Sequence, residues 1–367
     1  MKISKRVLPA VLMALLTGGA LFAGGGKEES PAPRSPSGES RILNVQIDVS
    51  ISTVDYQGTQ EGNALTVMRT LGEGLYYLEA DGSIQPGLVE SAAKSADGLT
   101  LTFKLKDTLW ADGSKVTAHD FVYSWQRLGD PAIAADYRRL LITAGIANAE
   151  AVIDGKKPVT ELGVKALDDK TLVVTQDVPV AFADSLFAFV PFYPLKKSFV
   201  EALGAKFAAS PEGVLSNGPF ILKTYEPNAE VVEVVKNPNY YRAGEVKLEG
   251  IRFQTIKDLQ QAALAYQTGI VDQVPRLSGE QIDIYKEDPE FQSHLGGYVY
   301  YLTPNQKDNR YLANISLRRA LALSVDREAL AKNILRDGSV SAEYLVARGL
   351  ANAPDDRSDF RDGGAGV

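Results

Sequence analysis

Few residues in this chain have the types and spacing that catalysis or metal binding requires. Its 367 residues include no cysteine and only two histidines, His119 and His294, which lie far apart in sequence. A zinc site would need both histidines together with carboxylates, and this spacing fits none of the usual ligand patterns. There is no Gly-x-Ser-x-Gly elbow and no Gly-x-Gly-x-x-Gly after a predicted strand. We therefore expect neither an enzyme nor a metal site, and no cofactor.

Two further ligand classes are disfavoured by composition. The run Gly24-Gly25-Gly26-Lys27 has the glycines and lysine of a phosphate-binding loop, but it lacks the first glycine, the following Ser or Thr and a preceding strand. The formal net charge of -7 and the pI near 5.2 argue against nucleic acid, because its binding domains are usually basic. Neither a nucleotide nor a nucleic acid is an expected partner.

Residues 1–23 have the three parts of a secretory signal peptide. A basic head is followed by an apolar run over residues 7–22 and then by small residues. The run is shorter than the ~20 residues that a membrane-spanning helix needs. We predict export with cleavage after Ala20 or Ala23, both positions being open. Residues 24–40 hold three prolines and few apolar residues, and predict a disordered spacer.

The absence of cysteine bears on the exported protein. It excludes disulfides, so the stability of the fold must come from its apolar core. It also leaves no thiol for the lipid that anchors many bacterial receptors. We therefore expect a periplasmic, soluble and unlipidated protein.

Apolar periodicity from Arg41 onward predicts a mixed α/β protein with more than one sheet and, from its length, two or more domains. Alternating or β-branched runs predict strands over residues 43–49, 99–105, 172–175, 231–235, 248–256 and 298–303. Helical spacing and capping residues predict helices over residues 62–78, from a Thr117–Asp120 capping box, from Asp258 to Gly269, from Asn314, and from Asp326 to near Gly338.

Several of these stretches resemble the oligopeptide-binding family of extracellular solute receptors. The signature-like stretch runs from Trp110 to Arg127, and the other matching stretches are 155–172, 216–220, 236–241 and 316–335. The Tyr-Ser-Trp-Gln-Arg form at 123–127 is closer to the oligopeptide branch than to the dipeptide, nickel or sugar branches. Similarity extends from about Leu43 to the end of the chain.

The resemblance implies a two-lobed periplasmic binding protein-like fold of the class with an extra inserted domain. It places the first lobe at 41–78 and 196–302, the inserted domain at 79–195, and the start of the second lobe at 303–367. The family's second lobe continues beyond the last residue here, and it includes an aspartate that pairs with the peptide's ammonium group. We therefore expect an incomplete second lobe; a fragment, a truncated gene product and a frameshift all remain open.

The resemblance also implies a function and a site. It implies a monomeric receptor that binds short peptides and delivers them to the membrane permease of an ABC importer. The alternatives are a truncated, non-trapping receptor body with a signalling or scaffold role, and a non-functional fragment. The residues that match family positions near the peptide are Gln57, Gly58, Thr59, Tyr137, Asn305 and Arg276. The sequence around Arg276 departs from the family, Gly58 could serve only a turn, and Tyr137 could simply pack.

Overall fold

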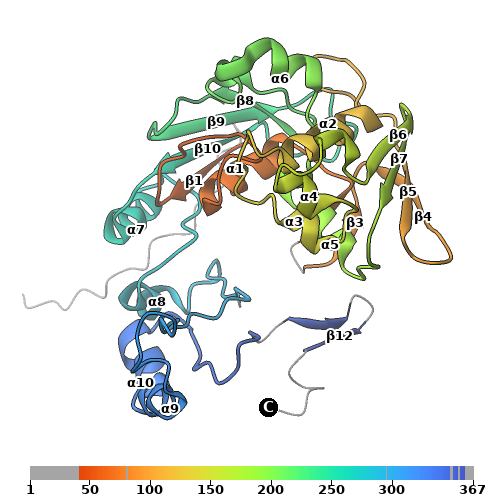
Figure 1. The fold of residues 1–367 in the computed structure, drawn as a ribbon. Coiled ribbons are helices and arrows are strands. Elements are labelled where there is room, and N and C mark those ends of the chain that lie inside the picture. Colours follow the sequence, from red (N-terminus) through yellow and green to blue (C-terminus); the bar gives the residue numbers. More distant parts are fainter. Residues whose placement is uncertain (1–40, 80–81, 295, 348–349, 354–355, 360–367) are drawn as a thin grey trace, which may run out of the picture. The chain divides into compact units, whose positions relative to one another are not determined.

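The computed structural model describes residues 41–79, 82–294, 296–347, 350–353 and 356–359. The predicted signal peptide and spacer lie outside the described residues. Two four-stranded sheets, each with its own apolar core, organise residues 41–255 (Figure 1).

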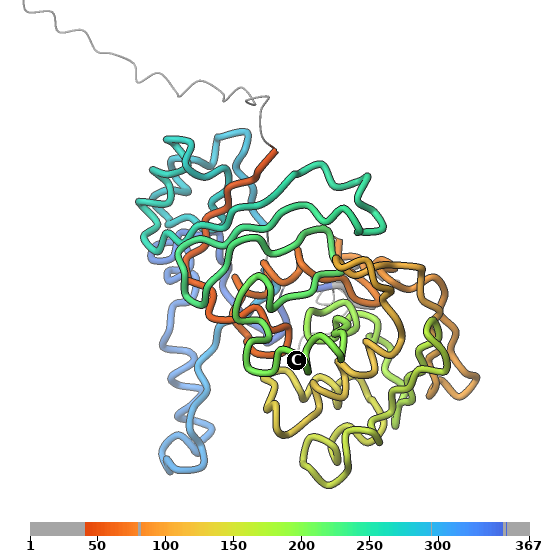
Figure 2. The backbone as a smooth tube through the Cα atoms, turned by 90° about the horizontal axis from the view of Figure 1, so that it is seen from above, coloured from red at the N-terminus to blue at the C-terminus, as the bar shows by residue number. Residues whose placement is uncertain are grey.

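The first sheet has the strand order β1-β10-β9-β8 and brings residues 42–47 beside strands that come much later in sequence (Figure 2). Its strands are β1 (Ile42–Ile47), β8 (Phe220–Thr224), β9 (Val231–Lys236) and β10 (Gly250–Thr255). β1 runs parallel to β10, with Val45 opposite Phe253, and the other pairs are antiparallel. The predicted strands at 43–49, 231–235 and 248–256 are thereby confirmed, with ends shifted by one or two residues.

Helix α1 (Gly62–Leu71) packs its apolar face on the first sheet. The Glu61 side chain caps it by accepting hydrogen bonds from the backbone N–H groups of Asn63 and Ala64, both at 2.7 Å. Its buried side chains are Ala64, Leu65, Val67, Met68 and Leu71. They join the core that includes Ile51, Val190, Val232 and Phe253.

The predicted helix over 62–78 is too long at its C-terminal end. The helix stops at Leu71, and the chain continues extended through Gly72 into strand β2 (Tyr76–Leu78). A Cβ atom at Gly72 would lie 2.6 Å from Oη of Tyr56 and 2.8 Å from Cδ2 of Tyr193. The backbone passes directly against two aromatic rings here, a contact that helical periodicity cannot reveal.

The second sheet has the order β4-β5-β7-β6 and is antiparallel throughout. Its strands are β4 (Val89–Lys94), β5 (Thr100–Leu105), β6 (Val164–Asp168) and β7 (Thr171–Thr175), and β2 pairs separately with β3 (Ile84–Pro86). Along β5, Leu101, Phe103 and Leu105 are buried in alternation, which confirms the predicted strand at 99–105. Strand β7 confirms the one at 172–175.

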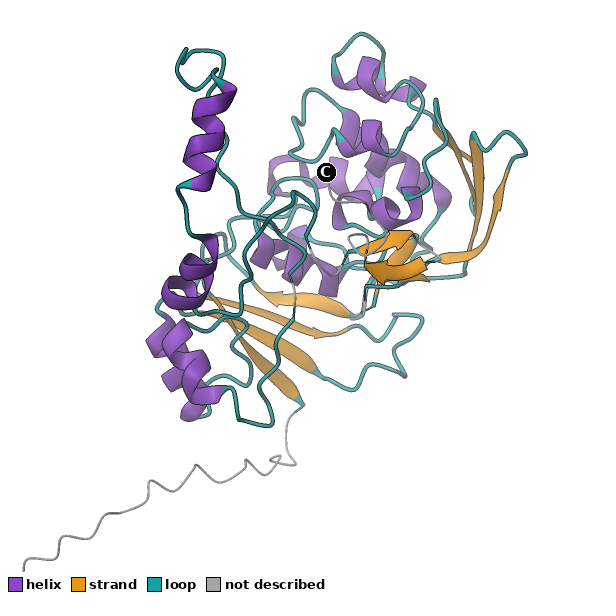
Figure 3. Ribbon diagram, turned by 90° about the horizontal axis from the view of Figure 1, so that it is seen from below, coloured by secondary structure: helices purple, strands orange, loops and turns teal. Residues whose placement is uncertain are grey.

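Helix α2 (Ala118–Gly129) packs against β6 and β7. Figure 3 shows helices gathered beside the strands of this sheet. The predicted capping box is confirmed, because the Asp120 carboxylate accepts from Thr117 N at 2.8 Å. Phe121, Trp125 and Leu128 are fully buried on one face of the helix. The shorter elements that complete this core are α3 (Leu140–Thr143), α4 (Ala149–Ile153), α5 (Ala183–Phe187), η1 (Val159–Glu161) and η2 (Val190–Phe192).

Eight further helical segments occur among the described residues. They are α6 (Lys197–Leu203), η3 (Gly204–Lys206), η4 (Pro211–Gly213), α7 (Leu259–Gln267), α8 (Gly279–Tyr285), α9 (Ile315–Leu323), α10 (Arg327–Ala329) and the π-helical turn η5 (Leu330–Leu335). The predicted caps are confirmed, since the side chains of Asp258, Asn314 and Asp326 each accept a backbone N–H of the helix that follows. Strands β11 (Ala351–Ala353) and β12 (Asp356–Asp359) form an antiparallel hairpin.

The predicted strand at 298–303 is wrong. None of the described strands pairs with this segment, which is irregular. Tyr298, Tyr300 and Leu302 are 81%, 93% and 94% exposed. A β-rich composition forms a strand only where a neighbouring strand accepts its backbone hydrogen bonds.

Candidate functional site

The loop after β1 makes a tight turn at Asp55–Gly58. The N–H of Gly58 donates to Asp55 O at 3.0 Å, and the N–H of Gln57 donates to Asp55 Oδ1 at 3.1 Å. A short polar side chain that accepts from the backbone two residues ahead is a standard turn device. The first predicted site residues therefore lie on a fixed turn.

The side chain of Gln57 points into the protein. It is 0% exposed, and its Nε2 donates to Ser124 O at 2.8 Å and to Pro191 O at 3.2 Å. Its Oε1 accepts from Nη1 of Arg127 at 2.7 Å. With both ends of the amide engaged and the whole residue buried, Gln57 shapes the turn and offers no exposed group to a ligand.

Backbone groups at this turn do remain unpaired. Among the described residues, none accepts a hydrogen bond from the N–H of Thr59, and none donates to the carbonyls of Gln57 and Gly58. The Thr59 side chain is occupied, because its Oγ1 accepts from Glu61 N at 3.0 Å just before α1. Of these three residues only Gly58 is exposed, so its unpaired carbonyl is the group that the backbone of an extended ligand could pair with.

Tyr137 lies beside this loop. Its half-buried ring meets Phe189 edge-to-face, with centroids 4.9 Å apart, and Gln60 Nε2 donates to the neighbouring Asp136 O at 3.4 Å. Burial raises the pKa of Tyr137, with smaller contributions from Tyr298 and Asp136. The hydroxyl therefore stays protonated at neutral pH and can donate a hydrogen bond.

The other two predicted residues are not joined to this cluster. Asn305 is exposed and its Oδ1 accepts from Asp308 N at 3.1 Å, within a local turn. Arg276 is also exposed. Within the part of the chain that the structure describes, neither residue makes a hydrogen bond or ion pair with residues 55–60 or with Tyr137.

The motifs at 216–220 and 236–241 build a buried joint around Glu73, a residue that the sequence analysis missed. Glu73 is 4% exposed, and its carboxylate accepts from the hydroxyls of Tyr240 and Tyr241 and from Nη2 of Arg242. Asn217 and Glu73 also exchange two hydrogen bonds. The only sequence signal was a lone acid between glycines, Gly72-Glu73-Gly74, preceding a strand.

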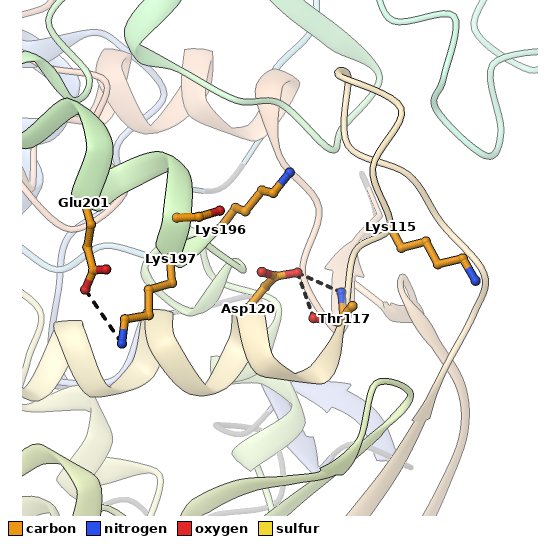
Figure 4. Close-up of a pocket in the computed structure, with 7 residues that line it drawn as sticks. Lys115, Thr117, Asp120, Lys196, Lys197 and Glu201 are labelled. Carbon is orange, nitrogen blue, oxygen red and sulfur yellow. Dashed lines mark hydrogen bonds and ion pairs between the residues drawn. The ribbon is translucent and has the colours of Figure 1, made fainter.

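A surface depression lies between the start of α2 and helix α6 (Figure 4). Its lining residues are Lys115, Thr117, Asp120, Lys196, Lys197, Ser198 and Glu201. Most of its charges are satisfied internally: Asp120 holds Thr117, Lys197 pairs with Glu201 at 3.7 Å, and Lys196 pairs with Asp112 at 3.0 Å. These three pairs keep the named groups engaged within the protein.

Within the described residues, no group of three or more His, Asp or Glu side chains is placed to hold a metal ion. No described helix has the length and apolar character needed to cross a membrane.

Comparison with known proteins identifies the family. The family model of bacterial extracellular solute-binding proteins, family 5 Middle, matches residues 83–363. The chain belongs to this family. Membership confirms that the chain is a solute-binding protein and not an enzyme.

Relatives of this family 5 chain are similar in sequence and in fold. It is 32% identical over 350 residues to the periplasmic oligopeptide-binding protein OppA of Escherichia coli, covering 93% of this chain and 62% of the relative. The structure of Listeria monocytogenes OppA bound to peptide superposes with a TM-score of 0.75 at 33% identity, covering 88% of this chain and 64% of that one. The pheromone receptor PrgZ gives a TM-score of 0.80 at 28% identity, with the same coverage.

These superpositions confirm the expected mixed α/β periplasmic binding protein fold. The family 5 chain spans about three fifths of the length of these relatives.

Proposed function

We propose that this protein is an exported, unlipidated periplasmic receptor that binds oligopeptides and delivers them to the membrane permease of an ABC importer. The observation that carries the proposal is the turn at Gln57–Thr59, where the exposed Gly58 has an unpaired carbonyl and the loop lies beside Tyr137, whose ring is half-buried. Family membership and the peptide-bound relative support it.

The chemistry of this turn suits a peptide of varied sequence. Backbone N–H and C=O groups recognise the main chain of an extended ligand, which is the same for every sequence. The side chains of Gln57 and Thr59 are engaged within the protein and read nothing on the ligand. Tyr137 offers an apolar ring face with a polar tip. We therefore propose peptides with loose side-chain preference.

The first test is calorimetry of the 367-residue chain with two versions of one tripeptide. One version is unmodified, and the other carries a single backbone N-methyl group that removes one N–H donor. Each backbone hydrogen bond is worth about 0.5–1.5 kcal/mol, so N-methylation at a pairing position should weaken binding roughly 2- to 13-fold. Equal affinities at every methylated position would contradict backbone pairing.

The second test identifies what the protein carries. Mass spectrometry of ligands released from protein purified out of the periplasm should detect short peptides. A well-folded protein that carries no peptide and gives no heat with any would favour the alternative, a receptor body that docks a membrane partner without trapping ligand.

A further inference from the structure

Arg127, the last residue of the Tyr-Ser-Trp-Gln-Arg motif, ties helix α2 to the loop after β1. Its guanidinium makes two parallel bonds to the Asp55 carboxylate, Nη1 to Oδ1 at 3.1 Å and Nη2 to Oδ2 at 2.7 Å. The side chains of Arg127 and Asp55 are only 11% and 16% exposed. Such a two-point geometry fixes orientation as well as position.

The same guanidinium makes two further contacts. Nη1 also donates to Gln57 Oε1 at 2.7 Å, and the guanidinium lies over the Phe207 ring at 5.2 Å from its centroid. The Arg127 side chain thus bonds to the loop at Asp55 and at Gln57, and its guanidinium also packs on the Phe207 ring.

The loop depends on the atoms that Arg127 holds. Asp55 Oδ1, which accepts from Arg127, also accepts from Gln57 N and so shapes the turn. The Gln57 side-chain amide is bonded to α2 at both ends. Its Oε1 accepts from Arg127, and its Nε2 donates to Ser124 O. Arg127, Asp55 and Gln57 therefore form a closed hydrogen-bonded ring, and Gly58 and Thr59 follow it directly in sequence.

We propose that Arg127 is a positioning residue, which holds the Asp55–Thr59 turn so that its unpaired backbone groups are preorganised for a peptide. The proposal rests on the proposed function for its ligand but not for its conformational effect. A lysine cannot replace the arginine here, because one ammonium group does not supply a planar fork that reaches two carboxylate oxygens and an amide together.

The test is hydrogen exchange of the full chain, read by mass spectrometry, in Arg127→Lys. We expect amide exchange in the segment around residues 55–60 to rise about 10-fold or more, because the amides of Gln57 and Gly58 lose a fixed turn. The amides of strand β5, in the second sheet, should exchange at the same rate as in the wild type. Unchanged exchange at 55–60 would overturn the proposal.

Arg242→Lys is the matched control. Arg242 also pairs with a buried carboxylate, that of Glu73, and also lies over aromatic rings, at the other joint. We expect this variant to leave residues 55–60 unchanged. Equal acceleration of the loop in both variants would show general loosening and would also overturn the proposal.

A second variant covers the case in which Arg127→Lys fails to fold. Asp55→Asn retains an oxygen that can accept from Gln57 N but loses the charge that holds the guanidinium. Its loop should exchange faster than in the wild type, by a smaller factor than in Arg127→Lys if both fold. No acceleration in Asp55→Asn would contradict the role of the ion pair.

The ligand arm separates the two proposals. If the wild type binds peptides, Arg127→Lys should lower affinity about 10-fold and reduce the discrimination against N-methylated peptides, which loss of a remote structural contact would leave intact. If the wild type binds no peptide while Arg127→Lys still frees the loop, the proposed function fails and the positioning role stands.

Discussion

Asn217 and Glu73 exchange two buried hydrogen bonds across 144 residues of sequence. The Asn217 Nδ2 donates to Glu73 O at 2.9 Å, and Glu73 N donates to Asn217 Oδ1 at 3.1 Å. The amide thus mimics a paired strand at the point where the chain leaves α1 for β2. Because Gly218 N also donates to Leu71 O at 2.9 Å, this contact joins the first sheet's helix to the segment that starts β8.

Asn217→Ala should therefore be among the more destabilising single changes. It leaves a buried backbone N–H and a buried C=O without partners, which costs about 2–4 kcal/mol of unfolding free energy. Urea unfolding followed by circular dichroism measures this. Asn217→Asp keeps an acceptor for Glu73 N but loses the donor to Glu73 O and brings a charge into a buried site, so it should be destabilised as well. An unaffected Asn217→Ala would contradict the structural role of the pair.

Tyr137→Ala should weaken peptide binding without unfolding the protein. The ring is half-buried against Phe189, so its removal takes away a contact surface beside the loop at the cost of a modest packing loss. We expect affinity to fall about 5- to 50-fold, equivalent to ~1–2.3 kcal/mol. Calorimetry with the unmodified tripeptide measures it.

Tyr311→Ala is the control for that variant. Tyr311 is 62% exposed, and its contacts among the described residues are local, with Arg310 and within the turn at 309–314. Its loss should leave affinity unchanged. A similar drop in both variants would mean that Tyr137 has no special place in the site.

The free energy of unfolding should depend on pH through Asp120, which lies in the first turn of α2. Burial raises the pKa of this carboxyl, although hydrogen bonds from Thr117 and Trp110 lower it in part. The folded state therefore holds this proton to higher pH than the unfolded state does. The contribution of Asp120 to the unfolding free energy is then largest at low pH and is lost as pH rises from about 4 through the raised pKa.

Asp120→Asn removes this titration while retaining an oxygen at the helix N-terminus. The stability of the variant relative to wild type should improve as pH rises from about 4 to 7, in urea unfolding at each pH. Asp112→Asn is the opposite control. Burial raises the pKa of Asp112, but hydrogen bonds from Ser114 and the Lys196 ammonium outweigh it, so the pKa is lowered overall. The stability difference of Asp112→Asn from wild type should be constant above about pH 4.

Export should leave a mature chain that begins at Leu21 or Gly24. The basic head and apolar run predict removal of the leader, and the lack of cysteine removes the acceptor for a thioether-linked lipid. Intact mass of the protein from the periplasmic fraction should match one of these two chains with no added fatty acid. A retained leader or an acylated mass would contradict the proposed localisation.

Local chemistry determined what the sequence alone could reveal about this protein. The caps at Asp258, Asn314 and Asp326 and the capping box at Thr117 act within three residues, so their types and spacing suffice to place helix starts. Alternating burial in β1 and β5 is likewise encoded residue by residue. The motifs that pointed to the family lie largely in these elements and in the buried joint.

Tertiary structure decided what depends on distant residues. The aromatic rings that lie against Gly72 come from Tyr56 and Tyr193, so the end of α1 could not be placed by periodicity. Residues 298–303 have the composition of a strand, but a strand also needs a partner, and none of the described strands pairs with them. The side chain of Gln57, expected near a ligand, turns inward because Arg127, 70 residues later, and Ser124 satisfy it better than water does.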